Sequence, residues 1–424
     1  MNRQRRQFLI NSRRLESEIE TKELRIWWIA EKIKVDRKTI SRWLAGTVKA
    51  AARENIQALA DLLECAFDDL CLQEEPAPVA VPEPKAMAAE LIRQKGLKDL
   101  LEPTHNHALL EALVSASIDP NLPPDTLAVL LLDLAHAKVR QHRYKESEEN
   151  AQQALKLLMN SSDLALRSRA RMALANVLSL QSKPREALDS MEVSVELARA
   201  CDDELLLAKG LSNHAHTLFM MAHFQDARLL VDEALLIHDR LRASTGRTDT
   251  SNCTALRVAM LIAFSLGENE LAQDYIQRGL VMARELKYRF SELLSLVFGV
   301  YAESLQPSPR QGCCEELLRY LSEIEALGHH PDACQYTVFA LLNLGQGEVA
   351  LEVALRTLKI ETSPYDEATK NMDVAAAEWF LGRKESARKR VQEAEGILRA
   401  HGYELRADEA MVRLETWKGV AQES

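Results

Sequence analysis

Several sequence features that mark common protein classes are absent from this chain. No run of eighteen apolar residues occurs in its 424 residues, and its N-terminus is basic and polar rather than apolar. These absences exclude a typical transmembrane helix and a typical secretory signal peptide. We therefore expect a cytoplasmic protein with no membrane partner.

Catalytic and metal-binding motifs are lacking as well. The chain has no Gly-x-x-x-x-Gly-Lys phosphate loop, no strand-associated Gly-x-Gly-x-x-Gly and no nucleophile elbow, so we do not expect an enzyme. Its seven cysteines show no Cys-x-x-Cys spacing, which argues against a disulfide framework and a zinc ribbon. The histidines at 214 and 216 point away from each other on a helix, and no Cys or carboxylate completes a tetrahedral set with them and His223. We predict no metal site and no cofactor.

Charge is distributed unevenly along the chain. The net charge is −10, but residues 1–53 hold 14 Lys and Arg against 6 Asp and Glu, a net of +8, which leaves −18 for the remainder. A basic head on an acidic body is typical of a DNA-binding module attached to a part that does not touch DNA.

Residues 29–46 have the pattern of two short helices joined by a tight turn. Ile29, Ala30 and Ile33 form one apolar stripe on the first helix, and Val35 fills the turn. Asp36 is placed to cap the second helix, because its carboxylate can accept from free N–H groups.

The second of these helices has a buried side and a basic side. Its expected buried residues are Ile40, Trp43 and Leu44. The opposite face carries the candidate base-reading residues Arg37, Lys38, Ser41 and Arg42. Arg and Lys can donate to guanine O6 and N7 in the major groove, and Ser can bond several base edges. A solvated basic face on a small helical domain is the alternative.

The flanking sequence resembles the lambda-repressor-like (XRE) helix-turn-helix family over about residues 8–72. An arginine-rich helix is expected from Phe8 to Glu20, and apolar helical patterns follow at 56–63 and 67–70. The resemblance implies double-stranded DNA as a partner, base reading by the four residues named above, and phosphate contacts from Lys49 and Arg53. The chain departs from the family at Lys34, where Gly is common, and at the adjacent Trp27 and Trp28, of which one is expected in the core.

A proline-rich segment separates this head from the rest. Prolines alternate with other residues from 74 to 84, which favours an extended tether of roughly 34 Å at about 3.1 Å per residue. The predicted organisation is a helix-turn-helix domain at 1–73, a linker at 74–85 and a helical repeat domain at 86–424.

The region beyond the linker repeats itself. It is rich in Ala, Leu and Glu, aromatics make up only 5% of the chain, and no alternating strand pattern is evident, so we predict an all-α fold. Small residues recur in similar local sequences with spacings of 40, 40, 45, 78 and 37. They are Ser147, Ala187, Ala227, Ala272, Ala350 and Ala387.

The gap of 78 residues fits two units, because Glu315–Ile324 can supply the missing second helix. Residues 86–118 suggest one further, degenerate pair at the start. Leu405–Val420 is expected to close the stack, since solenoid ends need a covering helix.

The repeats resemble the tetratricopeptide (TPR) family in a lengthened form over about residues 125–400. This resemblance implies an α-solenoid whose concave surface is lined by the first helix of each unit. The candidate ligand-binding residues of that groove are His136, Arg140, Arg169, Asn176, Lys209, Ser212, His216 and Arg257. Asn and cationic side chains suit an extended peptide, whereas solvated helix residues are the alternative.

A repressor-like head on a TPR-like body resembles the RRNPP group of peptide-responsive quorum-sensing regulators. The resemblance implies a transcription regulator whose repeat domain binds a short peptide that changes DNA binding, and we expect a homodimer. Two alternatives remain. The body could recruit a partner protein to DNA, or the chain could be an enzyme or an enzyme's inhibitor with the head used only as a fold.

Overall fold

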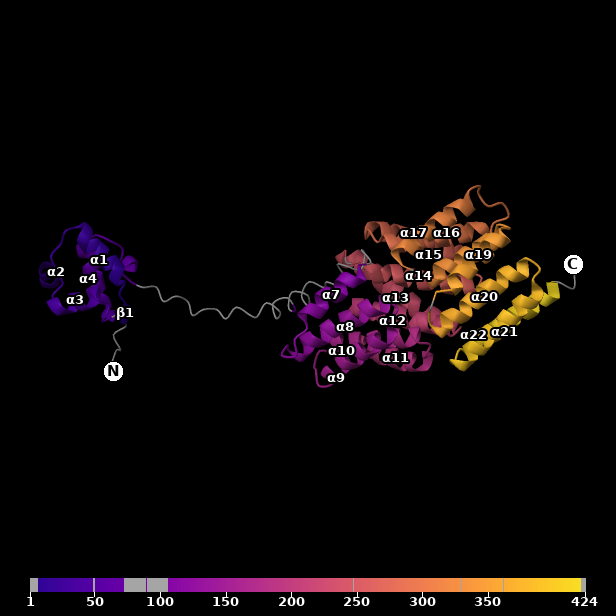
Figure 1. Cartoon of the computed structure of the whole chain (residues 1–424), viewed down its shortest axis with the longest axis horizontal. Coiled ribbons are helices and arrows are strands. Elements are labelled where there is room, and N and C mark those ends of the chain that lie inside the picture. Colours follow the sequence, from indigo (N-terminus) through magenta and orange to yellow (C-terminus); the bar gives the residue numbers. More distant parts are fainter. Residues whose placement is uncertain are drawn as a thin grey trace. The chain divides into compact units, whose positions relative to one another are not determined.

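The computed structural model describes residues 7–48, 50–71, 89, 106–246, 248–328, 330–360 and 362–420. Contacts divide the chain into two compact units, Met1–Pro82 and Glu83–Ser424 (Figure 1). The expected linker at 74–85, the predicted phosphate contact Lys49 and most of the degenerate pair at 86–118 lie outside the described residues.

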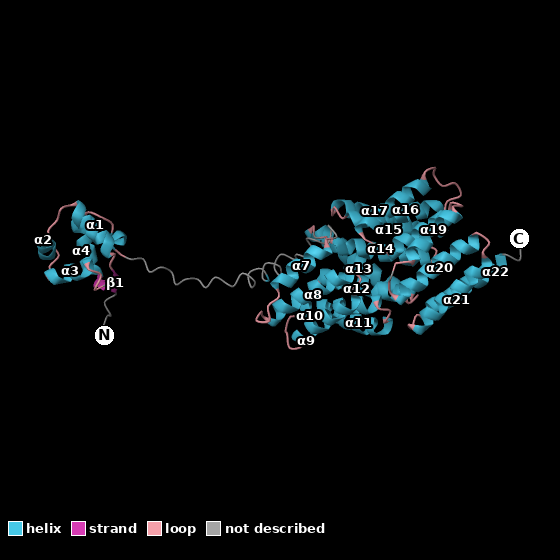
Figure 2. Ribbon diagram, in the orientation of Figure 1, coloured by secondary structure: helices cyan, strands magenta, loops and turns pink. Residues whose placement is uncertain are grey.

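The first unit is a small helical domain that also contains a short antiparallel ladder (Figure 2). Its elements are β1 (Gln7–Leu9), α1 (Ser12–Thr21), α2 (Ile26–Lys32), α3 (Arg37–Leu44), β2 (Ala50–Ala52), α4 (Arg53–Leu63) and the 3₁₀ helix η1 (Phe67–Leu70).

The prediction that a helix begins at Phe8 is wrong for the first turn of that helix. Phe8 lies in β1 and pairs with Ala51 of β2, and its ring meets the ring of Phe67 edge-on at 5.4 Å. The helix begins only at Ser12, because the Asn11 side chain accepts from the backbone N–H of Arg14 at 3.2 Å and so caps it there.

The helix-turn-helix itself follows the sequence pattern. Ile29 and Ile40 are fully buried, as are most apolar residues of the two predicted stripes, whereas Leu44 is only partly buried. Lys34 has φ +57°, so it occupies in strained form the left-handed position that a Gly would take without cost. Trp28 packs against the core while Trp27 is 55% exposed, which confirms that only one of the two is a core residue.

The second unit is a stack of antiparallel helix pairs (Figures 1 and 2). After α7 (His107–Ser117), the pairs are α8 (Pro124–Arg140) with α9 (Tyr144–Leu157), α10 (Leu164–Leu180) with α11 (Pro184–Ala200), α12 (Glu204–Met220) with α13 (Phe224–Thr245), α14 (Thr250–Ser265) with α15 (Asn269–Glu285), α16 (Arg289–Ser304) with α17 (Cys313–Leu327), α18 (Pro331–Asn343) with α19 (Gly347–Leu358) and α20 (Pro364–Phe380) with α21 (Lys384–Ala400).

The predicted small residues are the positions where paired helices meet. All six are buried, from Ser147 at 1% exposure to Ala387 at 0%. Ser147 is accommodated because its hydroxyl donates to the Ala135 carbonyl of the facing helix at 2.8 Å. Helix α17 confirms the missing second helix that was expected at Glu315–Ile324, and α22 (Glu404–Val420) confirms the closing helix.

Tight turns join most first helices to their partners. In the turn between α8 and α9, His142 takes φ +59°, and the backbone N–H of Arg143 donates to the Lys138 carbonyl at 2.9 Å. The sixth unit repeats this turn with Gly345 at φ +75°. Such a left-handed residue ends a helix while satisfying its last carbonyls.

The stack also closes on itself, because its last helices contact α12 and the turn after α10. Met220 of α12 shares a buried apolar cluster with Met372 of α20 and Tyr403. The backbone N–H of Tyr365 donates to the Ser182 hydroxyl at 2.9 Å across 183 residues of sequence. The last helices therefore partly close the concave side.

None of the helices described here combines the length and apolar character needed to cross a membrane. Within the described ranges, no cluster of three or more His, Cys, Asp or Glu side chains is arranged to hold a metal ion.

Candidate nucleic-acid interface and ligand cavity

Helix α3 presents the four predicted base-reading residues on its outer face. Arg37, Lys38, Ser41 and Arg42 are all exposed, whereas Ile40 on the opposite face is fully buried. The side-chain spacing of i, i+1, i+4 and i+5 therefore produces one continuous polar strip over the N-terminal part of the helix.

Local capping fixes the start of this helix. The Asp36 carboxylate accepts from the backbone N–H of Lys38 at 2.7 Å, as the sequence indicates. The buried side is held from α1, because the Ser12 hydroxyl donates to the Trp43 carbonyl at 2.5 Å. The strip is thus carried by a helix whose ends are both fixed, which is the geometry that groove reading needs.

Arg53, the predicted phosphate contact at the start of α4, is exposed and stacks on two rings. Its guanidinium lies 5.9 Å from the Phe8 ring and 5.5 Å from the Phe67 ring. This stacking ties the β1 strand, α4 and η1 together. A guanidinium held in this way still presents N–H groups to solvent.

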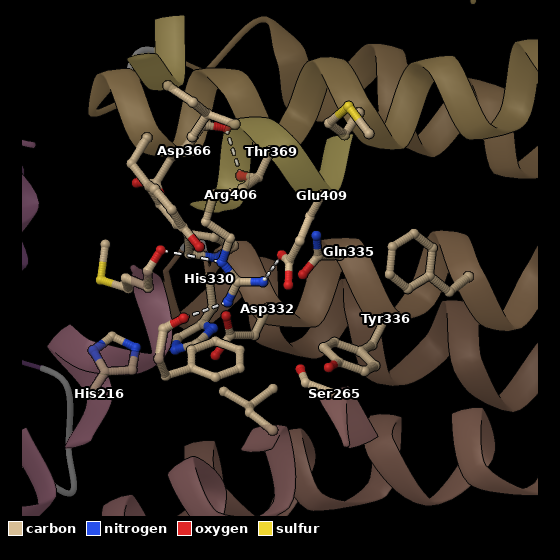
Figure 3. A pocket seen from close by; sticks show the side chains of 18 of the residues that line it. His216, Ser265, His330, Asp332, Gln335, Tyr336, Asp366, Thr369, Arg406 and Glu409 are labelled. Atoms are coloured by element: carbon tan, nitrogen blue, oxygen red, sulfur yellow. Dashed lines mark hydrogen bonds and ion pairs between the residues drawn. The ribbon is translucent and has the colours of Figure 1, made fainter. Parts of the chain in front are cut away.

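The repeat unit contains a partly open cavity of about 360 Å³. Most of its wall comes from the first helices α8, α10, α12, α14, α18 and α20, as the repeat pattern predicts. Four residues of α22 and Leu398 of α21 complete it. This volume lies at the lower end of the range typical of small-ligand pockets. The wall mixes aromatic rings such as Phe219 and Tyr336 with arginines and carboxylates (Figure 3).

A charged pair crosses the cavity floor between α14 and α18. The Arg257 guanidinium lies 2.5 Å from the Asp332 carboxylate. Burial alone would raise the pKa of Asp332, but the positive charge of Arg257 holds it below its ordinary value. Burial, together with the same arginine, lowers the pKa of the neighbouring His216 to about 4, so this imidazole is neutral at pH 7.

Arg406 of α22 occupies the centre of the cavity wall (Figure 3). Its guanidinium donates to the carbonyls of Phe219 at 2.5 Å and Met220 at 3.2 Å, which are the last residues of α12. It also lies over the Phe219 and Phe224 rings at 4.7 and 4.9 Å, and it pairs with Glu409 at 2.9 Å. Arg406 therefore joins the end of the chain to its third repeat unit.

The first turn of α20 supplies a third carboxylate, Asp366. Its backbone N–H donates to the Ser363 hydroxyl at 3.1 Å, and the Thr369 hydroxyl donates to its backbone carbonyl at 2.9 Å. Burial raises the pKa of its side chain to about 6, against the opposing effects of Ser363 and Lys370.

Three of the predicted groove residues line the cavity: Arg140, His216 and Arg257. Five do not line it. Ser212 is buried and donates to the Ala208 carbonyl of its own helix, and Lys209 pairs with Asp249 at 2.6 Å. His136 packs against the His107 ring, while Arg169 is exposed and Asn176 is partly buried.

The cavity residues from α18, α20 and α22 were missed by the sequence analysis. Their positions repeat at helical spacing, as Asp332, Tyr336 and Phe339 do on α18, and as Arg406, Glu409 and Arg413 do on α22. Extending the first-helix rule beyond the fourth unit would have found the cavity residues of α18 and α20. Nothing in the sequence alone indicates that α22 turns back to α12.

Comparisons with known proteins agree with this division of the chain. The profile of the Cro/C1-type HTH DNA-binding domain matches residues 10–72, and a tetratricopeptide repeat profile matches residues 125–200. No curated protein matches the sequence.

Solved structures resemble this chain at low sequence identity. A Rap protein complexed with competence and sporulation factor is 12% identical, with a TM-score of 0.59 over 93% of this chain and 99% of that one. The Rap conjugation gene regulator of plasmid pLS20, in complex with the Phr* peptide, is also 12% identical, with a TM-score of 0.50 over 92% and 97%. Bacillus thuringiensis PlcR, in complex with the peptide PapR7 and DNA, is 15% identical, with a TM-score of 0.42 over 66% and 95%.

The chain thus combines a Cro/C1-type helix-turn-helix domain with a TPR-like repeat body, as the sequence predicts. The domain types found in it are DNA-binding and repeat modules rather than enzyme families.

Proposed function

We propose that this protein is a cytoplasmic, sequence-specific transcription regulator of the RRNPP type, in which a short peptide bound by the repeat body alters DNA binding by the head. The observation that carries the proposal is the joining, in one chain, of an exposed polar strip on α3 and a partly open cavity of mixed polarity lined by first helices and α22.

The head supports DNA reading through its exposed cations. We propose that Arg37, Lys38, Ser41 and Arg42, which are exposed on α3, contact base edges. Arg53 and Lys49 are proposed to contact phosphates and so to set register. The net charge of +8 over residues 1–53 attracts DNA although the whole chain is acidic.

The body supports regulation through the way its helices meet around the cavity. Because the walls come from units distant in sequence, a ligand there would contact both sides of the closure between α12 and α22. A ligand shifts a conformational equilibrium only by its different affinities for the two states, and a site across a closure provides that difference.

We also propose that the protein acts as a homodimer. One head offers a small interface, and repressor-like modules gain affinity by occupying half-sites about 34 Å apart. Light scattering is expected to show a dimer on DNA. A monomer both free and DNA-bound would contradict this part of the proposal.

DNA selection followed by titration tests the proposed function. The full chain is used to select its operator from a random duplex library, and affinities are then measured by gel shift at fixed salt. Arg37→Ala and Arg42→Ala should each weaken operator binding by about 1–3 kcal/mol and relax base preference. Arg399→Ala in the repeat body removes an equal charge and should leave operator binding unchanged. Failure to select any sequence would defeat the DNA-reading assignment.

One observation favours a second candidate, recruitment of a partner protein to DNA. Leu229 and Leu236 of α13 are 71% and 68% exposed and lie seven residues apart on one helix face. An exposed apolar stripe of this kind is a feature of protein contact surfaces. Normal operator binding without any peptide response would favour this reading.

A further inference from the structure

The cavity wall carries more positive than negative groups. Among the described residues that line it, four are arginines and three are carboxylates. Two of the arginines have a partner within the wall. Arg257 pairs with Asp332 at 2.5 Å, and Arg406 pairs with Glu409 at 2.9 Å (Figure 3). The groups that remain are two arginines and one carboxylate, so the charge left over is positive.

The remaining carboxylate, Asp366, serves the start of α20. Its backbone N–H donates to the Ser363 hydroxyl at 3.1 Å, and Ser363 bonds back to its carboxylate, so the two residues cap each other. Asp366 is therefore committed to its own helix rather than to an arginine of the wall.

Arg413 of α22 lines the cavity without a carboxylate partner in the described part of the chain. Glu409 precedes it by four residues, a spacing at which Glu and Arg on one helix commonly pair, but Glu409 pairs with Arg406 instead. The positive charge of Arg413 also acts on Asp373, but that side chain is 3% exposed and its burial raises its pKa to about 7. The guanidinium of Arg413 is thus available to a ligand.

An aromatic contact holds Arg413 in place. Its guanidinium lies 5.7 Å from the centroid of the Phe339 ring, which lines the same cavity. Stacking uses the flat face of a guanidinium and leaves the N–H groups at its edge able to donate. Because Arg413 is exposed and also lines the cavity, it stands where the cavity meets solvent and a ligand can reach it.

We propose that the ligand of this cavity carries a carboxylate that Arg413 binds. This inference rests on the proposed function, since it defines the chemistry of the peptide. Two sources can supply the carboxylate: the C-terminus of the peptide or an acidic side chain. A carboxylate accepts from two N–H groups of one guanidinium, and the positive excess of the wall favours the same charge.

The test uses the full chain and four pools of synthetic pentapeptides whose other positions are drawn at random from uncharged residues. Two pools contain one glutamate, with a free or an amidated C-terminus. The other two contain glutamine in its place, again free or amidated, so the amidated glutamine pool has no carboxylate. Peptides retained with the protein after size-exclusion separation are counted by mass spectrometry.

The wild-type chain should retain peptides from at least one carboxylate pool about tenfold more than from the amidated glutamine pool, as expected for one charge-assisted hydrogen bond at an exposed site. Comparison of the amidated glutamate pool with the free glutamine pool identifies the side chain or the C-terminus as the source. Arg413→Gln should abolish the preference. Arg413→Lys, which keeps the charge but loses the forked geometry, should retain part of it.

Arg319→Gln is the matched control. Arg319 is also exposed, and its guanidinium lies 5.0 Å from the Tyr320 ring, but it belongs to α17 and does not line the cavity. This variant removes the same charge from a similar setting, so it should keep the whole preference.

Three results would overturn the inference. They are equal retention of all four pools by the wild-type chain, an unchanged preference in Arg413→Gln, and an equal loss of preference in Arg319→Gln. Each would mean that Arg413 does not select a carboxylate, and each leaves peptide binding standing. Retention of no pool would overturn this inference and the peptide component of the proposed function together, while operator selection tests the DNA-binding component independently.

Discussion

Replacing Arg406 should open the repeat body at the contact between α22 and α12. The Arg406 side chain is 17% exposed and donates to the last two carbonyls of α12 while stacking on the Phe219 and Phe224 rings. Hydrogen bonds from a charged donor contribute about 1.5–3 kcal/mol, and a partly desolvated cation–π contact contributes about 0.5–2 kcal/mol. These contributions overlap, so we expect Arg406→Ala to weaken the closure by about 2–4 kcal/mol.

Hydrogen exchange measured by mass spectrometry is the assay for this change. Arg406→Ala should speed exchange in the C-terminal turn of α12, in the first turns of α20 and in α22, because these segments meet at the closure. The helix pair α14–α15 should exchange as in the wild type. Arg406→Lys keeps the charge but loses the forked geometry, so an intermediate effect is expected.

Arg399→Ala is the matched control for this experiment. Arg399 forms ion pairs with Glu395, Glu404 and Asp408, yet its side chain is 43% exposed and all its partners lie within nine residues. Exposed pairs of this kind contribute little to stability, because solvent screens them. If Arg406→Ala changed exchange no more than Arg399→Ala, the closure would not depend on Arg406 and the reasoning would be refuted.

Two further predictions concern the packing and pH dependence of the repeats. Burial raises the pKa of Asp373 to about 7, so the folded state keeps a proton that the unfolded state releases near pH 4. The free energy of unfolding, measured by urea titration, should therefore fall as the pH rises from about 4 to 7, and Asp373→Asn should remove that dependence. Parallel pH profiles of the wild type and the variant would contradict this prediction. A Cβ at Gly347 would come within 2.6 Å of the Phe380 ring, so Gly347→Ala should cost about 1–3 kcal/mol in thermal unfolding, whereas Gly396→Ala, in open space on α21, should gain about 0.5–1 kcal/mol. Equal effects of the two alanines would show that the contact at Gly347 relaxes freely.

Local signals made the recognition helix predictable from sequence. Asp36 as a cap, the apolar stripe through Ile29 and Ile40, and the polar strip opposite all depend on residues within one or two turns of each other. The repeat register was predictable for the same reason, because each crossing needs a small residue such as Ala227 at a fixed place in its own pair.

Long-range pairing explains what the sequence did not reveal. Residues 50–52 are all alanine, which favours helix, yet Ala51 pairs with Phe8 in the short ladder because the core holds the two segments together. The cavity could be predicted even less from the sequence. Whether Arg406 reaches Phe219 depends on the curvature that several helix pairs accumulate, and no local sequence pattern determines that curvature.

The closure between α12 and α22 also constrains how this architecture can change. Solenoids in which each unit touches only its neighbours can gain or lose a repeat without disturbing distant units. Here Arg406 must meet the end of α12, so inserting or deleting one pair between them would carry the arginine past its carbonyl partners. The geometry of this contact therefore fixes the number of repeats in this stretch.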